Sequence, residues 1–74
     1  MTQGDNTTQP ACLALERLSS VLARTGLSRS DIYRKAQLGK FPKPVKLGDR
    51  ASAWPEHEVT AWIAERIAAR ERTA

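Results

Sequence analysis

The side chains best suited to chemistry in this sequence are arginines and lysines, and they gather in its middle third. The segment Arg24–Arg50 carries eight basic residues against two acidic ones, Asp31 and Asp49, a net charge of +6, whereas the whole 74-residue chain carries only +4. Clustered positive charge attracts polyanions, and the attraction grows with the number of phosphates neutralised. A basic cluster is by itself more often a solvated surface, so nucleic-acid binding depends on the elements that position it.

Residues that hold metals or perform catalysis are not grouped in the sequence. His57 has no second histidine or cysteine at ligand spacing. Glu56 and Glu58 suit the start of a helix, where they complement its dipole, better than they suit a catalytic pair. Seventy-four residues form one small domain with little room for a cleft between walls. We therefore predict a binding module rather than an enzyme, with no cofactor, metal or small-molecule ligand.

The N-terminal segment and the single cysteine bear on the compartment. No apolar run approaches the roughly 18 residues of a membrane span, and Met1–Pro10 is polar, unlike a signal peptide. Cys12 has no second cysteine to pair with. These features predict a cytoplasmic protein with no membrane partner. Residues 1–12 are predicted to be a disordered tail, and residues 13–74 a folded domain.

The first expected elements are a short segment of uncertain type and a short helix. Cys12–Leu18 fits either a strand or the start of a helix. Ser19 is a candidate N-cap for the helix that follows. That helix should end at Thr25-Gly26, because glycine suits the left-handed position that closes a helix.

A second helix follows after a tight turn. Ser28 is its candidate N-cap, with an acidic residue three positions later, and the helix is expected to reach about Leu38 and end at Gly39. Its apolar stripe is narrow, since Ile32 and Ala36 share one face, and the rest of its surface is polar and basic. Two short helices joined by a glycine-containing turn are typical of a helix-turn-helix unit, whose second helix enters the major groove of DNA.

An extended connection and a hairpin are expected next. Phe41 is a candidate core anchor, and the prolines after it keep the connection extended. Apolar and polar residues then alternate on both sides of a Gly48-Asp49 turn. This pattern predicts a two-stranded hairpin that places four apolar residues on one face: Val45, Leu47, Ala51 and Ala53.

A longer helix closes the domain. Pro55 suits its first turn. An apolar face follows at helical spacing, formed by Val59, Trp62, Ile63, Arg66 and Ile67. Trp54 and Trp62 are both expected in the core rather than stacked on bases. The fold class predicted from these elements is a mainly α winged helix-turn-helix with a small β-hairpin.

This fold assigns roles to the basic and hydroxyl side chains. Arginine can bind guanine through two hydrogen bonds, and serine can bind a base or a phosphate. Lysines and arginines of the connection and hairpin supply charge to the DNA backbone without reading sequence. The predicted DNA-binding residues are Ser28, Arg29, Ser30, Tyr33, Arg34, Lys43, Lys46 and Arg50. Asp31 would repel a phosphate, so we expect it to cap the helix or face its turn.

Three segments resemble the AlpA-like prophage regulatory proteins. They are Thr25–Arg34 (TGLSRSDIYR), Phe41–Gly48 (FPKPVKLG), and Trp54 with Glu58-Val59 and Ala61-Trp62. The combined pattern spans about Glu16–Arg70 and is specific, whereas any one segment alone is a weak signal. The sequence departs from the family at Asp31, where threonine is frequent, and at Lys35 or Ala36, where a large apolar residue is frequent.

The resemblance implies a winged helix, because the family is similar to phage excisionases and to the DNA-binding part of the MerR group. It also implies a small transcriptional regulator that often controls integrase expression or prophage excision. Carried over by position, the DNA contacts would be Arg29, Ser30, Tyr33 and Arg34 on the helix and Lys46 and Arg50 on the hairpin.

Three functions remain open on these grounds. The first is a sequence-specific transcriptional regulator, and the second is an excisionase-like protein that bends DNA for an integrase. The third is a protein-interaction adaptor that keeps the fold without binding DNA, although an adaptor need not keep a basic segment. The expected partner is double-stranded DNA. Self-association on the DNA is also considered, because one domain of this size reads only a few base pairs.

Overall fold

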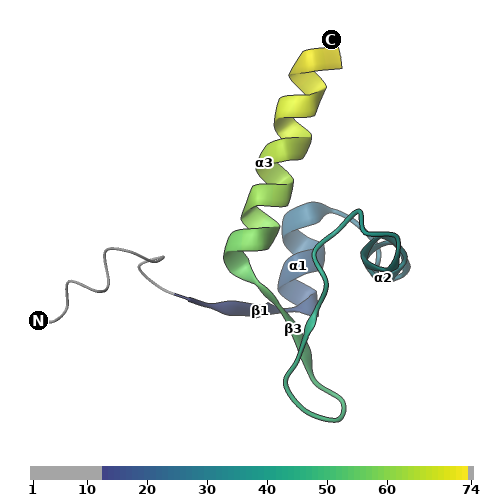
Figure 1. Ribbon diagram of the computed structural model, residues 1–74, viewed down its shortest axis with the longest axis vertical. Helices are drawn as coiled ribbons and strands as arrows, with labels where there is room; N and C mark the ends of the chain where they lie inside the picture. Colours follow the sequence, from purple (N-terminus) through teal and green to yellow (C-terminus); the bar gives the residue numbers. More distant parts are fainter. Residues whose placement is uncertain (1–12, 74) are drawn as a thin grey trace, which may run out of the picture.

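Between residues 13 and 73, the part of the chain that the structure describes, three helices pack with a small antiparallel sheet (Figure 1). The computed structural model has these elements in the order β1 (Leu15–Arg17), α1 (Leu18–Thr25), α2 (Arg29–Gln37), β2 (Val45–Lys46), β3 (Ser52–Pro55) and α3 (Glu56–Thr73). The predicted winged helix-turn-helix is confirmed. The predicted tail over residues 1–12, with Cys12, lies outside the described residues.

The hairpin formed by β2, β3 and the loop between them is called the wing below. Val45 pairs with Ala53, and the Leu47 amide donates to the Ala51 carbonyl at 2.8 Å. Directly paired residues share a face of a sheet, so the four apolar residues lie together as predicted. Val45 and Leu47 are nonetheless exposed. Only the base of the wing, at Ala53 and Trp54, therefore belongs to the core.

The segment that fitted either a strand or a helix start contains a strand, β1. It pairs with β3 on the side away from β2, with Glu16 opposite Trp54. No local pattern predicts this pairing, because three residues show little alternation and the partner strand is distant along the chain. Alternation along β1 buries Glu16 and leaves Leu15 and Arg17 exposed.

Helix α1 begins two residues earlier than predicted. Ser19 is not its N-cap: Arg17 occupies that position in an extended conformation, and no side chain caps the helix. The reason is that β1 runs directly into α1, so strand pairing fixes Arg17 and Ser19 falls inside the first turn. The predicted end is confirmed, because Gly26 has a φ of 76° and its amide donates to the Leu22 carbonyl at 2.8 Å.

Helix α2 has both predicted ends. The Ser28 hydroxyl accepts a hydrogen bond from the Asp31 amide at 3.2 Å, which confirms the N-cap. At the other end Gly39 has a φ of 75°, and two backbone hydrogen bonds, from Gly39 to Ala36 and from Lys40 to Lys35, close the last turn. This glycine-terminated arrangement satisfies carbonyls that the helix leaves free and turns the chain away from its axis.

The core lies where α1, α2, β3 and α3 meet, and its buried members are Val21, Ile32, Phe41, Trp54 and Val59. Both tryptophans also fix the connection after α2, because Trp54 Nε1 donates to the Pro42 carbonyl at 3.0 Å and Trp62 Nε1 to the Lys40 carbonyl at 2.8 Å. Phe41 packs edge-on against Trp62, with ring centroids 4.9 Å apart. The predicted core roles of all three aromatic residues are confirmed.

A polar cluster ties β1 to two helices. Glu16 is 5% exposed, and its carboxylate accepts hydrogen bonds from the Ser20 hydroxyl at 2.6 Å and from the Arg24 guanidinium. Arg24 also donates to the Thr60 hydroxyl of α3 at 2.6 Å. Arg24 therefore links β1, α1 and α3. Its charge is neutralised by Glu16 within the fold and does not contribute to the basic surface.

Helix α3 begins one residue later than predicted. Pro55 is not in its first turn but is the last residue of β3, opposite Leu15, and the helix starts at Glu56. Pairing with β1 keeps the chain extended through Pro55. The Glu56 amide then donates to the Ala14 carbonyl at 2.9 Å, a bond that proline, which has no N–H, could not make.

The predicted apolar face of α3 packs on the core only in its first half. Val59 is buried, Trp62 and Ile63 are half-buried, but Arg66 is exposed and Ile67 is 50% exposed. In Figure 1 the second half of α3 extends away from the sheet, at the end of the molecule opposite the wing. Within residues 13–73 no helix combines the length and the apolar character that a bilayer span requires.

Candidate nucleic-acid interface

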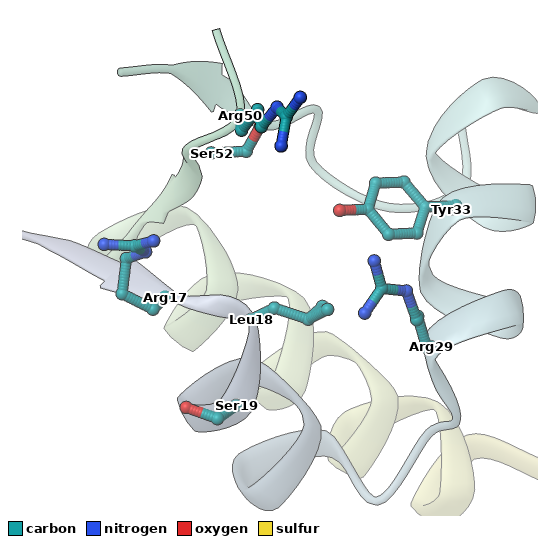
Figure 2. Close-up of a pocket in the computed structure, with 7 residues that line it drawn as sticks. All are labelled: Arg17, Leu18, Ser19, Arg29, Tyr33, Arg50 and Ser52. Atoms are coloured by element: carbon teal, nitrogen blue, oxygen red, sulfur yellow. The ribbon is translucent and has the colours of Figure 1, made fainter. Parts of the chain in front are cut away.

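The predicted DNA-binding residues of α2 lie on two different sides of that helix. On α2, Ser30 and Arg34 are exposed on the outward face, and Gln37 continues that face at helical spacing. Arg29 and Tyr33 lie on the flank of α2 that is turned toward the wing (Figure 2). The outward face and the inner flank of α2 therefore present different side chains to a partner.

A cleft of about 470 Å³ opens beside that inner flank (Figure 2). Its lining comes from three places: Arg17–Ser19 at the junction of β1 and α1, Arg29 and Tyr33 on α2, and Arg50 and Ser52 on the wing. In Figure 2 Arg17 and Arg50 face Arg29 and Tyr33 across the open space. This hollow, called the basic cleft below, brings three predicted residues together, namely Arg29, Tyr33 and Arg50.

Packing fixes the direction of Arg29 and Tyr33. The Tyr33 ring contacts the buried Trp54 edge-on, with centroids 5.9 Å apart. The guanidinium of Arg29 lies over the Tyr33 ring, 5.9 Å from its centroid. Such a cation–π contact holds the guanidinium in place without neutralising its charge. Arg29 is thus oriented into the basic cleft by a stack that begins in the core.

Asp31 has the capping role expected of it. It pairs with Arg34 at 2.7 Å, and the hydrogen bond from the Ser28 side chain is the largest effect lowering the pKa of Asp31 from its usual 3.8, with Arg34 contributing further. Its carboxylate is thereby directed at the first turn of α2. The acidic residue on the predicted recognition helix is therefore used within the helix.

The remaining predicted residues lie outside the basic cleft. Lys43 borders a smaller hollow of about 280 Å³ with Pro44, Gln37 and Tyr33. Lys46 is exposed on β2, opposite Ser52 of the cleft. The Ser28 hydroxyl is occupied as the N-cap of α2. Tyr33 is the residue shared by the two hollows, since it borders both.

Sequence reasoning missed Arg17, Ser19 and Ser52, which complete the basic cleft. Arg17 precedes the basic segment that the charge count singled out, and Ser19 was predicted as a cap. If Leu15–Arg17 is taken as a strand, alternation places Arg17 on the same face as the apolar Leu15, so no local signal marked Arg17 as a surface residue of the site. Its meeting with α2 and the wing depends on the pairing of β1 with β3.

The part of the chain that the structure describes offers no cluster of metal-binding side chains. Residues 13–73 contain no group of three or more histidine, cysteine, aspartate or glutamate side chains placed to hold an ion. The chemistry of the basic cleft is instead that of guanidinium and hydroxyl groups, which donate hydrogen bonds to anionic oxygens.

Comparison with known proteins identifies the family. The family model described as prophage CP4-57 regulatory protein (AlpA) matches residues 15–67. The chain belongs to this AlpA family. The matched span starts at the first residue of β1 and includes every residue that lines the basic cleft. The resemblance inferred from the sequence motifs is thus confirmed, and the family is one of regulatory proteins.

A phage protein is also similar to this chain. An uncharacterized protein of Enterobacteria phage P4, ORF88, is 50% identical to this chain over 56 residues, which is 76% of this chain and 64% of that protein. The chain therefore matches less than two thirds of the length of that relative. No solved structure matches the chain.

Proposed function

We propose that this AlpA-family chain is a sequence-specific DNA-binding regulator of transcription, of phage or prophage type. The observation that carries the proposal is the convergence of exposed basic side chains from α2, the wing and the β1–α1 junction on one side of the fold. Double-stranded DNA has phosphates on both sides of a groove. A helix flanked by basic elements matches that pattern.

In the proposed complex α2 enters the major groove, which is about 12 Å wide and admits a helix. Ser30 and Arg34, on the outward face, then reach base edges. The ion pair of Arg34 with Asp31 does not prevent this, because Arg34 is 59% exposed and a helical pair at this spacing contributes only about 0.2–0.5 kcal/mol. Arg34 can exchange one carboxylate hydrogen bond for a guanine at little cost.

The wing supplies contacts to the DNA backbone in this proposal. Lys43 and Lys46 are exposed on the connection and on β2, and Arg50 lies at the wing loop. These side chains would attract any duplex equally, whatever its sequence. Because one domain reads only a few base pairs, we also propose that several copies bind side by side on a natural site. We also propose that the protein acts in the cytoplasm, where the DNA of a phage or prophage is found.

The proposal is tested by titrating a fluorescently labelled duplex of arbitrary sequence with the protein and following anisotropy at several salt concentrations. If five or six phosphates are neutralised, the slope of log K against log salt should be about −5. Binding that is absent even at low salt would contradict the proposal and favour an interaction adaptor. The presence of a steep slope would exclude the adaptor function.

A further inference from the structure

We infer that the basic cleft holds a backbone phosphate of the bound DNA, with Arg17 as one arm of a three-arginine clamp, and that Arg29 contacts this phosphate rather than a base. The inference rests on the proposed DNA-binding function. It adds a site that lies outside the recognition surface of α2. It also adds a residue, Arg17, from an element that precedes the helix-turn-helix.

The charge of the basic cleft suits a phosphate. Most other arginines between residues 13 and 73 contact a carboxylate, as Arg24, Arg34 and Arg72 do. Within the same described residues, Arg17, Arg29 and Arg50 have no carboxylate within ion-pair distance, yet they line one hollow. Three like charges gathered without a counterion repel one another. An anion bound between them removes that repulsion, so the cleft is suited to an anionic group.

The chemical groups that line the basic cleft, and its volume, also suit a phosphate. Besides the guanidinium groups, the cleft is lined by the hydroxyls of Ser19, Tyr33 and Ser52, and Figure 2 shows the Tyr33 hydroxyl directed into the space. Guanidinium and hydroxyl groups together match the oxygens of a phosphodiester. The volume of about 470 Å³ is many times the roughly 30 Å³ that one water occupies in the liquid. The cleft therefore has room for a phosphate and parts of its sugars.

The orientation of Arg29 favours a phosphate over a base as its ligand. Arg29 lies over Tyr33, and Tyr33 packs against the buried Trp54, so this guanidinium is held on the inner flank of α2. Base edges lie at the floor of the groove, in front of the outward face, where Ser30 and Arg34 are exposed. A concave site beside the helix is reached by the backbone that borders the groove. Arg29 is accordingly placed to fix the position of the protein on the duplex and not to read the base sequence.

The variant Arg17→Ala tests the clamp. Anisotropy titrations should show binding weakened by roughly tenfold, since a hydrogen bond to a charged group is worth about 1.5 kcal/mol or more. The loss should be the same factor on duplexes of different sequence, and the salt slope should become shallower by about one. Arg17→Lys should restore the slope because it keeps the charge. Circular dichroism of both variants shows whether the fold is kept.

Arg66→Ala is the matched control. Arg66 is exposed on the part of α3 remote from the cleft, and its loss removes the same charge; affinity and slope should stay at the wild-type values. Arg29→Ala should behave like Arg17→Ala, with a loss that is uniform across sequences. Replacing single duplex phosphates by neutral methylphosphonates should identify one position at which the substitution weakens binding by the wild type by a larger factor than binding by Arg17→Ala, because Arg29 and Arg50 still contact that phosphate in the variant.

Two outcomes separate this inference from the proposed function. If the wild type binds duplex but folded Arg17→Ala binds with wild-type affinity and slope, the clamp is wrong and the proposed function stands. A loss for Arg29→Ala that is confined to one base position would likewise overturn the phosphate role of Arg29. If the wild type binds no duplex at low salt, the proposed function fails and the clamp fails with it.

Discussion

At the residue scale, the structure divides the basic side chains by what they already contact. Arg24 is engaged with buried Glu16, Arg34 with Asp31, and Arg29 with the Tyr33 ring. These contacts differ in how easily DNA could replace them. The bond to Glu16 is protected from solvent, the pair with Asp31 is exposed, and the cation–π contact leaves the Arg29 charge available. Arg29 and Arg34 are therefore suited to DNA, and Arg24 to the fold.

Arg34→Ala and Lys46→Ala should differ in their effect on sequence preference. If Arg34 reads a guanine, its loss should cost about 1–3 kcal/mol on the preferred site and relax the preference at one base position. Lys46 contacts only backbone in the proposed complex, so its loss should weaken all duplexes alike. Binding selection from a randomised duplex pool measures both effects. A uniform loss for Arg34→Ala would show that Arg34 contacts phosphate only.

At the scale of the elements, the three-residue strand β1 contributes both to the packing of the helices and to the basic cleft. It carries Glu16 into the space beneath α1 and Arg17 to the edge of the basic cleft, because successive side chains of a strand point to opposite faces. The buried carboxylate joins α1 and α3 through Ser20, Arg24 and Thr60. One face of β1 thus holds the helices together, and the other face contributes to the proposed binding surface.

Glu16→Ala should destabilise the fold without altering a DNA contact. Removing the acceptor leaves the Ser20 hydroxyl and the Arg24 guanidinium without a partner that they have in the native state. We expect a loss of about 1–3 kcal/mol in the free energy of unfolding, measured by urea denaturation. Ser20→Ala, which removes one of the two bonds, should cost less. Equal stability of the wild type and Glu16→Ala would show that the cluster does not hold the elements together.

Local patterns in the sequence predicted the helices of this fold better than the points where a strand runs into a helix. Ser28 and the two glycines with positive φ mark helix ends by chemistry that acts within a few residues, and those ends are where they were predicted. Ser19 and Pro55 were each misplaced by the same cause, the pairing of β1 with β3. That pairing joins segments far apart along the chain, and neither segment carries a local pattern that reveals it.

At the scale of the whole molecule, the two ends of the fold differ in character. The wing lies at one end, and the second half of α3 extends from the other (Figure 1). The basic cleft is lined in part by the wing residues Arg50 and Ser52. Arg72 on that half pairs with Glu65 at 2.8 Å, so its charge is balanced locally. The free positive charge is concentrated at the wing end. A polyanion should therefore approach from that end and leave α3 beyond the core untouched.

The residues of the basic cleft differ in whether local patterns in the sequence could reveal them. Arg29, Tyr33 and Arg50 could be proposed from the sequence because they belong to the helix-turn-helix and wing patterns. Arg17 could not, because its place in the cleft is created only when β1 folds back onto β3. The sequence thus indicated α2 and the wing, whereas the third side of the basic cleft required the tertiary structure.

The central claim, that DNA is bound at the wing end by α2 and the basic cleft, is tested most directly by mapping amide chemical shifts. Isotope-labelled protein would be titrated with a short duplex and its backbone amides followed by NMR. The account predicts shifts for residues 17–19, for the amides of α2 and for residues 50–52, with little change beyond Ile67. Shifts confined to the second half of α3, with the basic cleft unchanged, would contradict it.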